Sequence, residues 1–325
     1  MSNLMTPISV LRESIEAGLV ALRQSNFPLL SILTKRSAFQ DNVKWNVDVT
    51  TTAAAGISGL AAAPAPSSDT VVGASLAIGA ARFAHTIRLT KNDVTQAAAI
   101  GVEPLTDLFR SHVDVAIQRI MLSVSQNLYT GVGTTATGGM VGLGTAALGT
   151  GAYAGLNPAT TGQEGWVSSQ QTATIASIDA SPVALETLFR NLKNGVTTAN
   201  GLFDLIVCNP TFLARYEAAY IANPKDAILT GQAALLASLG YNVYQYAGRP
   251  IVGDNSCPAN VAYALDTQSA DLYTRQTSET QAMSGLNVVV GQIASDTATA
   301  MVFEVAVFPQ LVLKNRLNLG RILLT

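Results

Sequence analysis

The chain has 325 residues, more than one hydrophobic core usually supports, which predicts about two domains or one domain with large excursions. Hydrophobic residues make up 48% of it and charged residues only 12%, a balance that excludes intrinsic disorder. The formal net charge of -2 argues against a protein dedicated to reading nucleic-acid sequence.

The N-terminal segment is predicted to contain a short amphipathic helix over 8–23, which Pro28 breaks. Arg12, Glu13 and Glu16 lie where a signal peptide needs an uninterrupted apolar run. We therefore expect a cytosolic chain.

The next segment, 43–91, is predicted to form a long two-stranded arm. Apolar residues alternate with polar ones from Val43 to Val49 and again from Phe83 to Leu89, as they do in strands with one covered face. Between them, 53–69 is rich in Gly, Ala, Pro and Ser and predicts a flexible tip. Because an isolated two-stranded ribbon is marginal in water, the arm is expected to need a partner surface.

The strongest helical pattern covers 103–130, where one apolar stripe runs from Leu105 to Leu128. A helix of that length would extend about 40 Å and act as a beam. The glycine-rich segment 131–155 follows it, and this glycine density predicts a connector that turns sharply or passes close to other backbone.

A second domain is predicted to open at Ser181, the N-cap of a helix that has Pro182 at its first position and ends before Gly195. An apolar strand ending at Cys208 follows, and then two helices over 210–222 and 226–239. Short strands recur at 241–246, 250–253, 261–265 and 270–274, so the region is α+β. The strand-like runs around Pro309 are expected to return beside the long helix.

Residues for chemistry are few. His85 and His112 are the only histidines, and each is predicted to have an ordinary structural role. Metal-binding H-E-x-x-H and paired C-x-x-C motifs are absent, and the glycine-rich segment lacks a Walker lysine. The two cysteines, Cys208 and Cys257, are too few for a structural zinc site or a disulfide framework, and we expect both to be reduced.

No pair of carboxylates is set apart by the sequence for acid–base chemistry. Four acidic residues are interpreted as parts of solvated or salt-bridged helix faces: Glu13, Glu16, Glu103 and Asp107. We therefore predict no catalytic, cofactor-binding or metal-binding residues, no cofactor and no enzyme activity. No run of about 20 apolar residues occurs in the chain, so no membrane contact is predicted.

The order of these elements resembles that of the HK97-fold major capsid proteins of tailed bacteriophages. The segments that carry the resemblance are KWNVDV, RFAHTIRL, the stripe from Leu105 to Leu128, GTGAYAGLN, LFDLIVCNP and YAGRPIVGD. The resemblance implies an α+β capsid fold in five parts. These are an N-arm (1–42), an extended E-loop hairpin (43–91), a P-domain with its spine helix at about 103–130 (92–180), an A-domain (181–295) and a return to the P-domain (296–325).

The resemblance further implies a virion protein, assembled in the host cytoplasm, whose hexamers and pentamers form an icosahedral shell around double-stranded DNA. It implies a portal as a partner and a cement protein as an optional one. Because only about 42 residues precede the arm, scaffolding is expected from a separate protein or from a segment cleaved away beforehand. The arm has no lysine between Lys44 and Lys91, so covalent crosslinking through the tip is not expected. Any contact with DNA is expected to be nonspecific and weak, with Lys35, Arg36 and Lys44 as candidates and ordinary surface charge as the alternative explanation of these residues.

Two alternatives stay open at this point. An encapsulin-like compartment has the same fold and encloses enzymes instead of DNA. An enzyme with an unrecognised site is the alternative from another class.

Overall fold

A computed structural model describes residues 27–48, 71–78, 81–90, 92, 95, 102–133, 139–147, 149, 151–199, 201–221, 243–277, 280–283, 286–293 and 300–325. Three predicted features, the helix over 8–23, the tip over 53–69 and the helix over 226–239, lie outside these residues, as do Glu13, Glu16 and the side chains of Glu103 and Asp107. The described residues form a mixture of helices and strands, which confirms the predicted α+β class.

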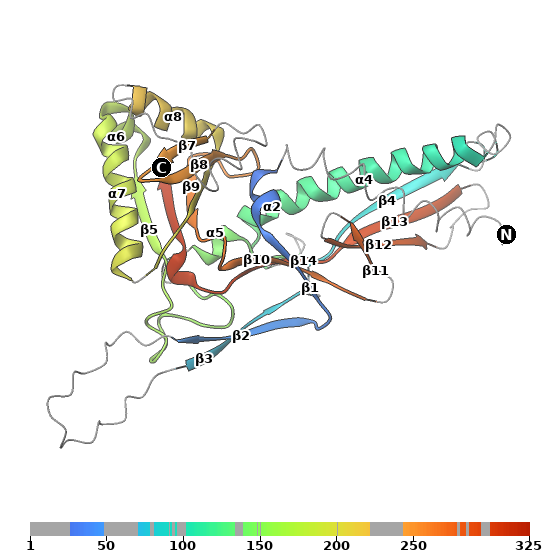
Figure 1. Cartoon of the computed structure of the whole chain (residues 1–325), viewed down its shortest axis with the longest axis horizontal. Helices are drawn as coiled ribbons and strands as arrows, with labels where there is room; N and C mark the ends of the chain where they lie inside the picture. The colour runs from blue at the N-terminus through green and yellow to red at the C-terminus, as the bar shows by residue number, and fades with distance from the viewer. Residues whose placement is uncertain are drawn as a thin grey trace, which may run out of the picture.

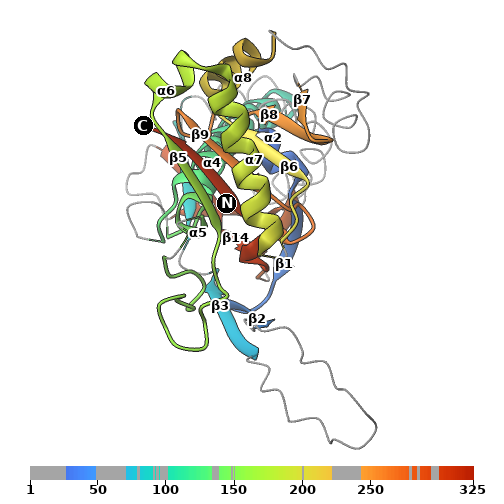
Figure 2. The same cartoon turned by 90° about the vertical axis from the view of Figure 1, so that its left-hand side faces the viewer.

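The largest sheet has six strands and lies at one end of the molecule, under three helices (Figures 1 and 2). The helices are α6 (Ile175–Ala180), α7 (Pro182–Thr198) and α8 (Pro210–Ile221). The strands, in spatial order, are β5 (Ser169–Ala173), β15 (Gly320–Leu324), β9 (Val261–Leu265), β6 (Leu205–Cys208), β8 (Arg249–Gly253) and β7 (Val243–Tyr246).

Strand β6 shows why this sheet is covered on both faces. All four of its residues are buried, and successive side chains point to opposite faces. Ile206 and Cys208 pack with the helices α7 and α8, whereas Leu205 and Val207 belong to the larger core on the other side. The continuous apolar run therefore marks a strand between two layers.

A four-stranded sheet extends away from the first along the helix α4 (Val102–Thr130), as Figure 1 shows. Its order is β11 (Thr280–Met283), β12 (Leu286–Ile293), β13 (Ala300–Val307) and β4 (Phe83–Thr90). The bounds of α4 confirm the predicted beam. One buried stripe covers its described side chains: Val113, Ala116, Ile117, Ile120, Met121, Val124 and Leu128.

The described residues form two smaller sheets as well. The three-stranded sheet has the order β1 (Thr34–Ala38), β10 (Ala270–Arg275) and β14 (Pro309–Leu313), and the helix α2 (Pro28–Ile32) precedes it. The two-stranded ribbon consists of β2 (Asn42–Asp48) and β3 (Val71–Ala77), and it projects from the body of the subunit (Figures 1 and 2).

The prediction that 43–50 and 83–90 are the two strands of one arm is wrong. Strand β2 pairs with β3, whereas β4 pairs with β13 in the four-stranded sheet. Both segments alternate with the same period, so the alternation gives the strands without giving their partners. The reason for the observed pairing is that Ile87 and Leu89 of β4 are buried in the core that contains α4.

The strands of the C-terminal segment belong to different sheets, whereas the sequence predicts that the segment returns beside the long helix. Strand β13 lies beside α4, as expected, but β15 joins the six-stranded sheet between β5 and β9. Its residues Ile322 and Leu324 pack in the core under α7. The last strand therefore links the far end of the chain to the part that opens at Ser181.

The helix α7 begins at Pro182 after Ser181, as predicted, but continues three residues past Gly195 to Thr198. A side chain at Gly195 would place its Cβ 2.4 Å from Ser169 Oγ. The glycine thus permits close packing of α7 against β5 and does not end the helix.

The connector after α4 contains the short helix α5 (Leu143–Ala146) and passes close to the end of α4. A Cβ on Gly131 would lie 2.5 Å from the Met140 carbonyl oxygen, and one on Gly142 would lie 2.5 Å from the Asn127 carbonyl oxygen. The prediction that glycines here allow close backbone approach is confirmed at these two positions.

Candidate assembly surfaces

The β2–β3 ribbon has two unlike faces. Val43, Trp45 and Val47 are half-buried, while Lys44 and Asn46 between them are exposed. The half-buried face turns toward the core of the subunit, where these side chains pack against buried apolar residues. The other face is exposed and the ribbon projects from the body, so a second chain can contact that face.

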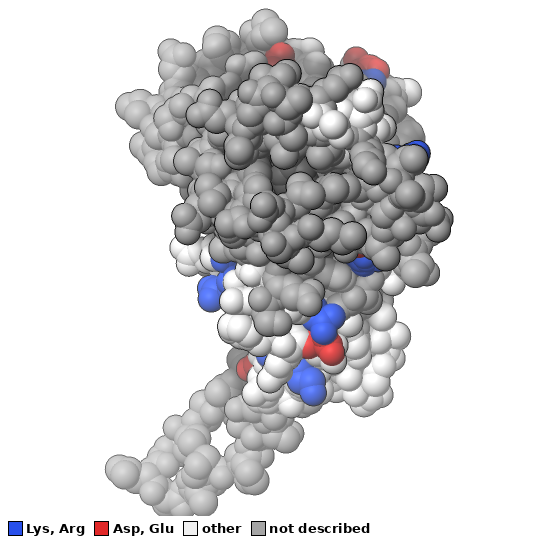
Figure 3. Space-filling view, turned by 90° about the vertical axis from the view of Figure 1, so that its right-hand side faces the viewer, with Lys and Arg blue, Asp and Glu red and all other residues white. Residues whose placement is uncertain are grey.

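Large apolar side chains also remain exposed away from the ribbon's inner face. Phe39, in the turn between β1 and β2, is 77% exposed, which is unusual for an aromatic side chain. The face of the subunit in Figure 3 shows only scattered charged side chains among the described residues. Within the described ranges, the other exposed large apolar residues are Val71, Val115, Leu122, Val132, Val183 and Leu202.

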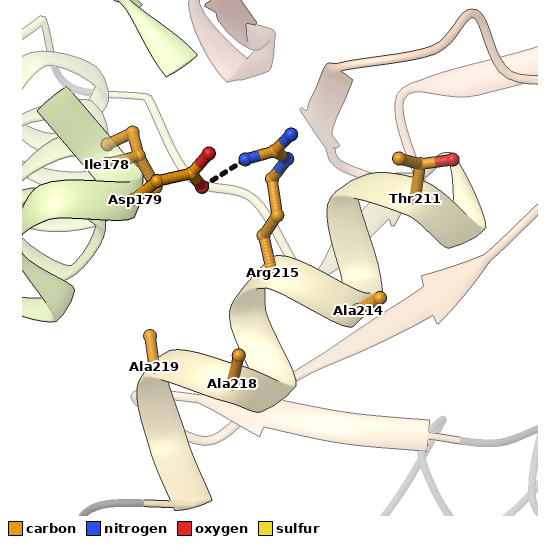
Figure 4. A pocket seen from close by; sticks show the side chains of 7 residues that line it. All are labelled: Ile178, Asp179, Thr211, Ala214, Arg215, Ala218 and Ala219. Carbon is orange, nitrogen blue, oxygen red and sulfur yellow. Dashed lines mark hydrogen bonds and ion pairs between the residues drawn. The ribbon is translucent and has the colours of Figure 1, made fainter. Parts of the chain in front are cut away.

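A shallow groove of about 470 Å³ lies between α6 and α8 (Figure 4). An ion pair between Asp179 and Arg215 crosses it, and small side chains of α8 form much of its wall. The pair is partly exposed, and no nucleophile and base are brought together here. The groove can therefore accept side chains of another chain more readily than it can perform chemistry; its lining is Ile178, Asp179, Thr211, Ala214, Arg215, Ala218 and Ala219.

Asp271 of β10 is a buried carboxylate between two cations. Its side chain is 1% exposed, and its Oδ2 lies 2.8 Å from Arg36 Nε and 2.5 Å from Lys314 Nζ. The carboxylate raises the pKa of Arg36. Arg36 was predicted to contact DNA, but its charge is compensated within the subunit, whereas Lys44 is exposed on the ribbon.

Arg316 is a fully buried cation held by carbonyl groups. Its Nε donates to the Ala146 oxygen at 2.9 Å, and its Nη1 donates to the oxygens of Gly151 and Trp166 at 2.5 and 3.1 Å. Burial lowers its pKa to about 10, so it is still charged at neutral pH. Arg316 thus ties the C-terminal segment to the connector.

Asp254, in the turn after β8, joins three parts of the chain. Its Oδ2 accepts from Tyr129 Oη of α4 at 2.7 Å, its Oδ1 accepts from the Ser256 amide at 2.8 Å, and the Leu29 amide of α2 also donates to it. Burial raises the pKa of this carboxyl group despite these hydrogen bonds. The carboxyl group is therefore more easily protonated in the folded chain than in the unfolded chain.

This raised pKa predicts a pH dependence of stability. The contribution of protonated Asp254 is full below its unfolded pKa of about 3.9 and is lost as the pH rises through the higher folded pKa. We expect the parent chain to lose stability relative to Asp254→Asn as the pH rises from about 4 toward 7. Urea denaturation of both unassembled chains across this range measures the difference, and a difference that does not change with pH contradicts the prediction.

The two histidines lie on different elements, whereas the two cysteines lie close enough to interact with each other and with Asp254. His85 Nε2 is 3.4 Å from Arg119 Nη1, while His112 is exposed on α4. Cys208 and Cys257 are free thiols, as predicted; both are buried, and burial raises the pKa of each. Within the described ranges, no three His, Cys, Asp or Glu side chains are grouped to hold a metal ion.

None of the helices in the described part of the chain is both long and apolar enough to span a bilayer.

Sequence reasoning missed Asp254, Asp271 and Arg316. No local signal singled out Arg316, because the stretch LVLKNRLNLGRILL also holds Lys314 and Arg321, and of these three cations only Arg316 is fully buried. A charged residue is costly to bury unless it is paired or hydrogen-bonded, so its burial, once the structure shows it, indicates a fixed internal contact. The partners themselves lie far away in the sequence and give no local pattern.

The sequence matches no family model and no curated protein. The structure, in contrast, is similar to a chain of the capsid asymmetric unit of cyanophage A-1(L), with a TM-score of 0.70, 21% identity and 92% coverage of both chains. It is also similar to a chain of Mycobacterium phage Adephagia, with a TM-score of 0.55, 15% identity and coverage of 92% and 90%.

A third similar structure is the holo-SrpI encapsulin complex from Synechococcus elongatus PCC 7942. Its TM-score is 0.57 at 9% identity, and the match covers 91% of this chain and 86% of that one. In all three cases the match covers more than nine tenths of this chain. The chain therefore has the HK97-like fold of phage capsid subunits.

Proposed function

We propose that this chain is a major capsid protein whose copies form hexamers and pentamers of an icosahedral shell around phage double-stranded DNA. The observation that carries the proposal is the match over 92% of both chains to the cyanophage A-1(L) capsid subunit. The projecting ribbon supports it, because a two-stranded ribbon is only marginally stable unless another surface covers it.

The encapsulin-like alternative is less favoured. The similarity to the cyanophage subunit is greater, with a TM-score of 0.70 against 0.57 and 21% identity against 9%. A structural role rather than an enzymatic one agrees with both kinds of neighbour. Its location would then be the virion, after assembly in the host cytoplasm.

We also propose the five-part division of the chain at 1–42, 43–91, 92–180, 181–295 and 296–325, with three adjustments. The pairing of β11 with β12 and of β12 with β13 favours placing 280–293 with the P-domain. The pairing of β4 with β13 favours placing 83–90 with the P-domain. The pairing of β15 with β5 and β9 favours an exchange of the last strand into the A-domain sheet. A separate scaffolding protein, a portal and a cement protein are the partners proposed alongside other copies of the chain.

The contents of purified particles test the proposal. We expect nuclease-resistant double-stranded DNA in particles from phage-producing cells, together with weak, salt-dependent binding of DNA to the subunit. A defined enzyme enclosed in stoichiometric amounts, with no protected DNA, would favour the encapsulin-like alternative.

Phe39→Ser is expected to impair assembly with little effect on the fold. The side chain is 77% exposed, so its removal should change the free energy of unfolding by less than about 0.5 kcal/mol. Sedimentation of assembly mixtures measures the yield of large particles, and circular dichroism checks the fold. Gln40→Ser, at the next exposed position of the same turn, is the control; equal yields from the two variants contradict a role of Phe39 in assembly.

A further inference from the structure

Each strand of the β2–β3 ribbon makes a hydrogen bond to the body of the subunit, which we call its anchor. Trp45 Nε1 of β2 donates to the Lys314 carbonyl oxygen at 3.1 Å. The Ser75 amide of β3 donates to the Ala154 carbonyl oxygen at 3.0 Å. Because these two acceptors lie on different segments, both segments must be in place for the ribbon to leave the subunit at one angle.

The loop that carries Ala154 has a fixed internal shape. Tyr153 and Leu156 exchange backbone hydrogen bonds of 2.9 and 3.0 Å, and Ala154 and Gly155 between them have φ angles of 56° and 80°. Trp166 Nε1 donates to the Tyr153 oxygen at 3.1 Å, and the two rings stack with centroids 6.3 Å apart. The position of the Ala154 oxygen therefore depends on the whole loop from 151 to 166.

Arg316 holds both ends of that loop. A single nitrogen of its guanidinium, Nη1, donates to Gly151 at the beginning and Trp166 at the end, while Nε holds Ala146. Arg316 also lies two residues after Lys314, whose carbonyl group accepts from Trp45 and whose ammonium group pairs with buried Asp271. The same short segment thus reaches both anchors of the ribbon.

We propose that Arg316 is a positioning residue that sets the angle of the ribbon within the subunit, through the 151–166 loop and the adjoining Lys314 segment. A ribbon held in this way is oriented before it meets another chain, which reduces the ordering cost of association. The proposal concerns a contact within one chain, so it is independent of whether the chain forms a shell and of what the shell contains.

The test is a distance measurement between the ribbon and the six-stranded end of the molecule. Nitroxide labels are placed at Lys44→Cys on the exposed face of the ribbon and at Asn194→Cys on the exposed surface of α7. The natural thiols of Cys208 and Cys257 are 0% and 2% exposed and should not react. Full-length labelled chains are diluted with unlabelled chains, so that pulsed electron paramagnetic resonance reports distances within one chain.

We expect a narrow distance distribution in the parent and a broadening of about twofold in Arg316→Met, as one orientation gives way to several. Val207→Ala is the matched control. It removes apolar volume from the six-stranded sheet, far along the chain from the ribbon's anchors, so it should lower stability and leave the distribution narrow. If Arg316→Met yields no soluble chain, Arg316→Lys replaces it, because lysine keeps the charge but cannot span the three carbonyl groups.

Ser75→Pro tests separately the hydrogen bond between the Ser75 amide and the Ala154 carbonyl group. Since the Ser75 amide points to Ala154, it points away from β2, and proline there removes the anchor without removing a bond between the strands. We expect broadening with little loss of global stability. The proposal is overturned if the distance distribution of the parent is already broad. It is also overturned if the distribution of the folded Arg316 variant, or that of Ser75→Pro, is as narrow as the parent's.

Discussion

Gly142→Ala is expected to destabilise the subunit by about 3 kcal/mol, the upper range for forcing extra volume into a packed site. The new Cβ would lie 2.5 Å from the Asn127 oxygen, 2.8 Å from the Leu128 oxygen and 2.9 Å from the Gly131 nitrogen. All three are backbone atoms at the end of α4 and the start of the connector, so no side-chain rotation relieves the overlap. Urea denaturation of the unassembled chain measures the loss.

Gly291→Ala is the matched control for this prediction. A Cβ at Gly291 of β12 meets no atom within 4 Å. Alanine there should leave stability unchanged or raise it by about 0.4–1 kcal/mol, because it restricts the unfolded chain. Equal stability of the two variants would contradict the view that the connector is packed against α4 through its glycines.

Deletion of 53–68 is expected to leave a folded subunit that assembles poorly. These residues lie outside the described part of the chain, but β2 and β3 on either side keep their seven-residue pairing and both anchors without them. Shortening a loop changes its closure free energy by only about 0.6 kcal/mol for each halving of its length, so the fold should persist. Assembly should be impaired because the shortened arm has less surface with which to contact another chain.

The deletion is measured by circular dichroism, urea denaturation and sedimentation together. A loss of about 1.4 kcal/mol at each contact lowers each association constant tenfold, and this loss is repeated around a closed assembly. Large particles at the parental yield would contradict the role of the ribbon as an arm. Loss of the circular-dichroism spectrum of the folded chain would instead show that the tip belongs to the core.

Local patterns in the sequence predicted the elements of this fold well. The apolar stripe after 103 predicts α4 because a long helix with one buried face has a strong period, and the structure places α4 at Val102–Thr130. The alternation in 43–48 and 83–90 likewise predicts β2 and β4 correctly as strands. The glycine density over 131–155 predicts sharp turns or close backbone approach, and Gly131 and Gly142 lie at such close contacts.

The arrangement of those elements could not be predicted in the same way. Strand alternation has the same period in every sheet, so it did not distinguish β3 from β4 as the partner of β2. The contacts of Arg316 join residues about 150 positions apart in sequence, and no pattern within a short window encodes them. Burial of an unpaired charge indicates that such contacts exist, but the three-dimensional structure is needed to identify them.

Electron microscopy of the purified full-length chain tests the central claim most directly, because assembly is the proposed activity. After expression with or without a scaffolding protein, we predict closed shells whose subunits are arranged as hexamers and pentamers. Discrete monomers or small oligomers under every assembly condition, together with turnover of a substrate, would contradict the proposal that this chain is a shell-forming subunit.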